Sequence, residues 1–172
     1  LRLDSHLHVH VLPPLHSLLL ALVREYRACY VRVPAELFHL PAASPLEQVM
    51  GHARRSLLAR WAFPLYSLLA AEGVAGSDFF VGAFASGLMT LGKLRDSLRA
   101  VLRKGTSRSC IEIMVHPGGL AAGENPAAFR AQYRGFYTAD ARAVERNLLV
   151  SPALTDMLES LGVVPYFPAA DK

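Results

Sequence analysis

One aspartate and three histidines stand close together near the start of the chain, within residues 1–12. These polar side chains alternate with aliphatic ones, and they are Asp4, His6, His8 and His10. Successive side chains of an extended strand point to opposite faces, so a strand here would direct all four groups to one side. Imidazole is the commonest metal ligand and a ready general acid or base. The pattern therefore favours a chemical site over a row of solvated histidines.

The spacing of these residues limits how many of them can bind one ion. At about 3.3 Å per residue, His6 and His10 would lie about 13 Å apart on a straight strand. That separation is too large for both to bind the same ion. Neighbours in the row, such as His6 with His8 or Asp4 with His6, could share one. Which of His8 and His10 takes part besides His6 stays open.

A second candidate, His116, ends another predicted strand, residues 110–116. Glu112 shares its face of that strand, and the turn 117–119 follows. Parallel α/β proteins build their active sites at the carboxyl ends of strands. If both strands end at one edge, a cation held by His6 and another ligand would polarise a carbonyl and activate water. His116, off the metal, could then protonate a leaving amine, which is the layout of metal-assisted amide hydrolysis.

The candidate catalytic residues are therefore His116 and Asp4. Arg32 lies at the end of a short predicted strand and could bind an anionic or hydroxyl-rich substrate, although a surface arginine is an equally good interpretation. His8 is a second candidate for substrate binding. His6 is the candidate metal ligand.

The secondary structure that positions these residues is predicted from hydrophobic periodicity and from the prolines and glycines that end helices and strands. Predicted strands cover residues 1–12, 29–33, 78–84, 110–116 and 163–167. Predicted helices cover residues 15–28, 53–72 with an interruption at Pro64, 90–104, 127–133, 139–149 and 151–161. Residues 35–52 are expected to be irregular, with a short helix at 46–50. The alternation of strands and helices predicts a parallel sheet, either open or wrapped as part of a barrel.

Composition narrows the class of protein. With 172 residues, 52% of them hydrophobic, the chain is long enough for a real core, and we expect one α/β domain over residues 1–172. The net charge of +4 is scattered without a run of basic and aromatic residues, so we expect no nucleic-acid partner. We also expect no membrane span, signal peptide or disulfide framework. A cytoplasmic location is the default expectation.

Several motifs occur in the order and at about the spacing seen in one known family. They are Leu3–His10 followed by Leu12-Pro13, Val31–Pro34, Ser77–Gly82 with Gly87–Thr90, and Glu112–Gly118. Together they resemble the YdjC-like carbohydrate deacetylases, a family that includes the chito-oligosaccharide deacetylases and a relative associated with hopanoid synthesis. The resemblance spans nearly the whole chain.

The resemblance implies a TIM-barrel-like fold, a parallel (β/α) barrel, and a divalent cation, Mg or Zn. It implies hydrolytic removal of an acetyl group from an N-acetylglucosamine-containing sugar, so a small carbohydrate is the expected partner, and a homodimer is possible. The first histidine of the DSHxHVH motif, a metal ligand in the family, falls on His6. The histidine of the HPG motif, which lies in the catalytic pocket, falls on His116.

One departure from the family pattern bears on activity. The family's opening strand carries an Asp-Asp-Phe-Gly motif, which supplies a metal ligand and a base, and this chain has no Asp-Asp pair. We therefore expect the chain to be the C-terminal two thirds of a deacetylase barrel, with the N-terminal strands absent. The alternative is an inactive fragment or pseudoenzyme that only binds a sugar or a partner.

Overall fold

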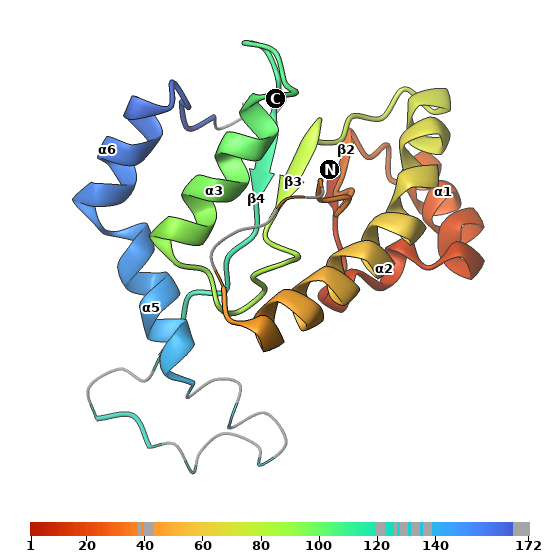
Figure 1. The fold of residues 1–172 in the computed structure, drawn as a ribbon. Coiled ribbons are helices and arrows are strands. Elements are labelled where there is room, and N and C mark those ends of the chain that lie inside the picture. Colours follow the sequence, from red (N-terminus) through yellow and green to blue (C-terminus); the bar gives the residue numbers. More distant parts are fainter. Residues whose placement is uncertain are drawn as a thin grey trace.

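The computed structural model describes residues 1–37, 39, 43–119, 123–125, 127, 131, 135 and 139–166, in which short strands alternate with helices (Figure 1). The strands are β1 (Arg2–Leu3), β2 (Tyr30–Val31), β3 (Phe79–Val81) and β4 (Ile111–Ile113). The helices are α1 (His16–Glu25), α2 (Pro45–Ala71), α3 (Leu91–Leu102), α5 (Asp140–Leu149) and α6 (Pro152–Ser160). Two 3-10 segments, η1 (His6–Val11) and η2 (Pro13–Leu15), follow β1.

The four strands lie side by side in chain order. β1 pairs with β2 and β3 pairs with β4, both in parallel. Two parallel bridges, Tyr30 with Ala75 and Glu36 with Phe80, place the β3 segment beside the β2 segment. Each pair is joined through a helix, as parallel neighbours require. The predicted parallel α/β arrangement is confirmed, whereas the strands of the described residues do not close into a complete TIM barrel.

Two apolar clusters hold the helices against the strands. In Figure 1, α1 and α2 lie on one side of the strands, and α3, α5 and α6 lie on the other. The first cluster contains Val11, Leu19, Val23, Ala28, Val31, Val33, Ala35, Ala62, Leu65 and Leu69. The second contains Val81, Phe84, Ala85, Met89, Leu94, Leu98, Val101, Leu148 and Met157. Helices from both halves of the chain therefore pack against the strands. This packing fixes the segments that follow the strands.

The opening segment is not the long strand that its alternation predicts. Extended pairing ends at Leu3, and the chain then turns through η1. Ser5 closes this turn, because its Oγ accepts the backbone N–H of His10 at 3.0 Å and lies 2.6 Å from His10 Nδ1. The prediction of three histidines on one strand face is therefore wrong. A local side-chain-to-backbone contact competes with the strand, as short polar side chains commonly do.

Helix α2 is longer than predicted, because it begins at Pro45. Ser44 Oγ accepts the N–H of Glu47, and the Glu47 carboxylate accepts the N–H of Ser44, so a capping box fixes the start. Pro64 lies inside the helix without ending it. The short helix expected at 46–50 lies within α2, whereas the irregular structure expected to continue to residue 52 is wrong beyond residue 44. The expected interruption at Pro64 is also wrong. Ala62 and Leu65, fully buried on either side of the proline, supply packing that outweighs its unfavourable local geometry.

The last predicted strand is also absent, because residues 163–166 adopt no regular structure and Phe167 lies outside the described residues. Most of the helix predicted at 127–133 also lies outside them. None of the helices within the described part of the chain combines the length and the apolar character needed to cross a membrane.

Candidate functional site

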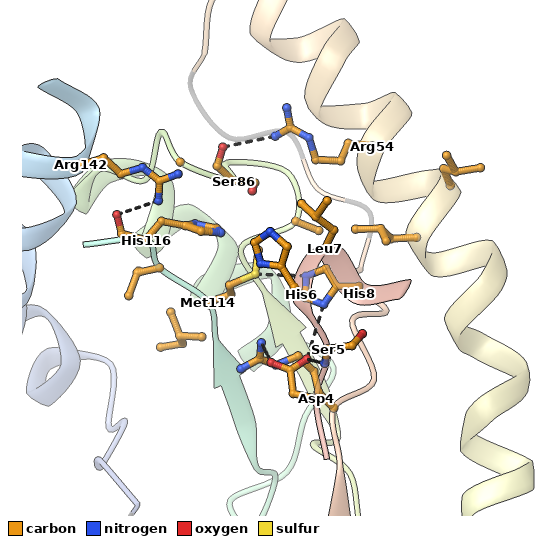
Figure 2. A pocket seen from close by; sticks show the side chains of 17 residues that line it. Asp4, Ser5, His6, Leu7, His8, Arg54, Ser86, Met114, His116 and Arg142 are labelled. Atoms are coloured by element: carbon orange, nitrogen blue, oxygen red, sulfur yellow. Dashed lines mark hydrogen bonds and ion pairs between the residues drawn. The ribbon is translucent and has the colours of Figure 1, made fainter. Parts of the chain in front are cut away.

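A pocket of about 870 Å³ opens where the strands end. Residues from the β1–η1 turn, from the ends of the β2, β3 and β4 segments, and from helices α2 and α5 line it (Figure 2). All the candidate residues named from the sequence line this one pocket: Asp4, His6, His8, Arg32 and His116. The structure thus brings the two histidine-bearing segments together, while the chemical role of each residue stays a prediction.

The turn after β1 determines how the three histidines of this segment are exposed. Leu7 and His8 have φ of 55° and 56°, in the left-handed region, which costs a residue with a side chain about 1–2 kcal/mol. His6 is exposed at the pocket, whereas His8 is turned back into the protein. His10 is buried elsewhere, with its Nε2 2.8 Å from the carbonyl oxygen of Arg32. Strained backbone of this kind tends to cluster at functional sites.

His8 is a largely buried residue of the pocket wall. Its Nε2 lies 3.2 Å from Met114 Sδ, its ring meets Phe80 edge to face, and its Nδ1 lies 4.0 Å from Asp4 Oδ1. Burial lowers the pKa of His8 to about 4, since the neighbouring Asp4 carboxylate offsets only part of the desolvation of the imidazolium. The ring is therefore neutral near pH 7 and can bind a substrate only as a neutral hydrogen-bonding group.

The depressed pKa of His8 predicts a dependence of stability on pH. Between about pH 4 and 6.5 the unfolded chain binds more protons at this ring than the folded chain does, so stability falls as pH falls. We expect His8 to account for a loss of about 2 kcal/mol between about pH 7.5 and about pH 5. The variant His8→Asn, which tolerates the left-handed backbone, should lack this component. Urea unfolding of both proteins at both pH values measures it, and equal losses would contradict it.

Asp4 and Arg32 form part of a polar network along the strand ends. Arg32 Nη1 donates to Asp4 Oδ2, and Arg32 Nε donates to Glu112 Oε1 at 2.6 Å. The hydroxyl of Tyr30 donates to the other Glu112 oxygen at 2.6 Å. Arg32 is thus neutralised by two carboxylates rather than presented alone to a ligand. Its expected contact with substrate remains a prediction, and its observed role is to fix the Asp4 carboxylate at the pocket.

His116 follows β4 and its ring points toward the pocket (Figure 2). Its backbone N–H donates to Glu145 Oε2, and its carbonyl accepts from Arg142 Nη1 at 3.1 Å. Its Nδ1 lies 3.8 Å from Glu145 Oε2 and has no hydrogen-bond partner among the described residues. Burial lowers the pKa of His116, with the Glu145 carboxylate opposing this shift and the Arg142 guanidinium adding to it. The imidazolium form of His116 is therefore less favoured than that of an ordinary exposed histidine.

The sequence-based candidates omit several residues of the site. The pocket lining includes Arg54, Ser86, Met114 and Arg142, and the fully buried Glu145 lies behind it. Arg142 and Glu145 are three residues apart in the sequence, and this spacing places them on the same face of α5. Nothing in the sequence linked that helix to His116. Only the packing of α5 against the turn after β4 reveals the connection, through the hydrogen bond from Gly118 N–H to the carbonyl of Arg142 at 3.1 Å.

The described residues do not fit the divalent cation that the resemblance implies. They contain no group of three or more His, Cys, Asp or Glu side chains placed to bind one ion. His6 is an exposed imidazole at the pocket, but Asp4 is engaged by Arg32 and His8 is turned toward Met114. A Mg or Zn site that includes His6 therefore stays a prediction.

Comparisons with known proteins bear on the family of the chain. A search of curated proteins and a search of solved structures returned no match. A protein-family model described as YdjC-like protein matches residues 2–160, which contain every pocket residue named above. The motifs that line the pocket and the extent of this match lead to one conclusion: the chain belongs to the YdjC-like family.

Proposed function

We propose that the pocket hydrolyses the N-acetyl group of an amino sugar, with N-acetylglucosamine-containing oligosaccharides as substrates. Membership of the YdjC-like family suggests a carbohydrate deacetylase-type function. The observation that carries the proposal is the meeting of His116 with Asp4 and His6 in one pocket, although more than a hundred residues separate them in the chain.

The reaction requires two events at the amide. The oxygen of a water molecule attacks the acetyl carbon while one proton of that water passes to the solvent, and the C–N bond then breaks as the nitrogen takes up a proton. The products are acetate and a free amino sugar. His116 is suited to deliver that proton, because its ring faces the pocket and burial keeps its pKa below the ordinary value.

Asp4 is suited to hold the attacking water. Its Oδ1 accepts the N–H of Ser5 at 2.7 Å and its Oδ2 accepts from Arg32. Each carboxylate oxygen can accept a further hydrogen bond, so the carboxylate can orient water while it is held by Arg32. Asp4 and His116 would then act on opposite parts of the same amide.

The direct test is acetate release from N-acetylated chito-oligosaccharides, followed through the methyl signal of free acetate by NMR. We expect acetate and a free amine in equal amounts. An O-acetylated sugar without an amide serves as a control, and release from it alone would contradict amide hydrolysis. A parallel sample with a chelator tests the predicted divalent cation separately.

A second candidate is a module that binds an amino sugar without cleaving it. The lack of three grouped metal-ligand side chains in the described part of the chain favours this reading. Calorimetry with the same oligosaccharides distinguishes the two. Binding that leaves every acetyl group intact after prolonged incubation, with and without added Mg²⁺ or Zn²⁺, supports the binding module.

A further inference from the structure

Two side chains of helix α5 hydrogen-bond to the backbone of His116. The Glu145 carboxylate accepts the N–H of His116, and one turn earlier Arg142 donates to the carbonyl of the same residue. The second Glu145 oxygen accepts the N–H of Met89 at 2.8 Å, just before α3. The two side chains therefore connect the end of β4 to two helices at the residue whose ring enters the pocket.

Glu145 is a costly residue to bury. Its exposed fraction is 0%, and a carboxylate taken out of water is destabilising unless it is paired and hydrogen-bonded. Both of its oxygens accept backbone N–H groups, which explains how it is tolerated. Its Oε2 also lies 3.8 Å from His116 Nδ1. That distance is short enough for a strong electrostatic effect on the imidazolium.

We propose that Glu145 is the positioning residue for His116. The Glu145 carboxylate holds the His116 ring with Nδ1 toward that carboxylate and Nε2 toward the pocket. The same carboxylate stabilises the protonated ring. The neutral ring then carries its proton on Nδ1, and the second proton is gained and lost at Nε2, where a leaving amine would lie. The catalytic consequence rests on the proposed deacetylase function, whereas the effect on the ring itself does not.

Other charged groups also act on this ring. Arg142 reaches it from α5, Arg54 from α2 and Arg32 from the segment after β2, and all three disfavour the imidazolium, while buried His8 lies across the pocket. Glu145 is the carboxylate that opposes these guanidinium groups at His116. Removing its charge should therefore leave a ring that protonates less readily.

The test is the titration of His116 by NMR in the wild type and in Glu145→Gln, with the pH dependence of acetate release measured in parallel. We expect the pKa of His116 to fall by about one unit in the variant, and the alkaline limb of the activity profile to move by the same amount. An unchanged pKa would overturn the proposal. If no variant releases acetate, the proposed function fails, but the titration still decides the role of Glu145.

Glu36→Gln is the matched control. Glu36 is also buried, with an exposed fraction of 4%, and also accepts two backbone N–H groups, from Gly82 at 3.1 Å and Phe84 at 2.6 Å. Glutamine disturbs the two sites in the same way. It has only one side-chain oxygen, so its NH2 group replaces the second oxygen and faces a backbone N–H. We expect Glu36→Gln to lower thermal stability but to leave the pKa of His116 unchanged. Equal pKa shifts in both variants would show a merely structural effect and overturn the proposal.

A measurement on the wild type covers the case in which Glu145→Gln does not fold. The ¹⁵N shifts of the two ring nitrogens identify which one carries the proton when the ring is neutral. We expect the proton of His116 on Nδ1, facing Glu145. A neutral ring with its proton on Nε2 would overturn the proposal without any substitution.

Discussion

Replacing His116 with glutamine is expected to lower acetate release by about 10²- to 10⁴-fold, the usual contribution of a positioned general acid. The loss should lie in kcat, because the ring is assigned to the transfer of a proton rather than to the binding of the sugar. Glutamine keeps the backbone N–H and carbonyl that Glu145 and Arg142 hold. The fold should therefore survive, and the effect can be measured by steady-state kinetics on N-acetylated chito-oligosaccharides.

His16→Gln is the control for the loss of an imidazole. The His16 ring makes one hydrogen bond, with Nε2 2.9 Å from the carbonyl oxygen of Val11, and His16 does not line the pocket. We expect acetate release by this variant to match the wild type. Turnover by His116→Gln within a few-fold of the wild type would remove His116 from the mechanism and leave the pocket without its proton donor.

The sequence predicts the order of the fold better than its local geometry. Three features follow from local patterns that agree with their tertiary surroundings. They are the β2 segment, the cap at Thr90 and the helix start at Ser151-Pro152. The meeting of His6 and His116 was also foreseeable, because parallel strands end at a common edge. These features depend on periodicity and on chain direction, which a single sequence records.

The opening segment could not be predicted from alternation alone. A period of two describes residues 3–11 equally well whether or not they are extended, and a local contact between Ser5 and His10 decides against the strand. The left-handed backbone at Leu7 is also hidden, since leucine rarely adopts it. The same limit applies to Glu145, whose importance depends on how α5 packs. Sequence patterns fail here where a long-range or strained contact determines the geometry.

Replacing Gly82 with alanine is expected to cost roughly 3 kcal/mol or more of stability, among the larger effects of a single substitution. Gly82 follows β3 with φ of 128°, a region that side chains avoid. An added Cβ would lie 2.5 Å from the carbonyl oxygen of Met114 and 3.0 Å from its Cβ. Because both neighbours belong to the adjoining segment, they can give way only if the two strand ends separate. Urea unfolding monitored by circular dichroism measures the loss.

Gly92→Ala is the matched control, because nothing lies within 4 Å of the Cβ it would add in the first turn of α3. Alanine there should stabilise the protein by about 0.5–1 kcal/mol, and a similar loss from both variants would contradict the close-approach explanation. The Gly82 variant should also impair acetate release. Met114, which an alanine would displace, contacts His8 and lies two residues before His116. The close approach of β3 to β4 thus sets the distance between the two histidine-bearing sides of the pocket.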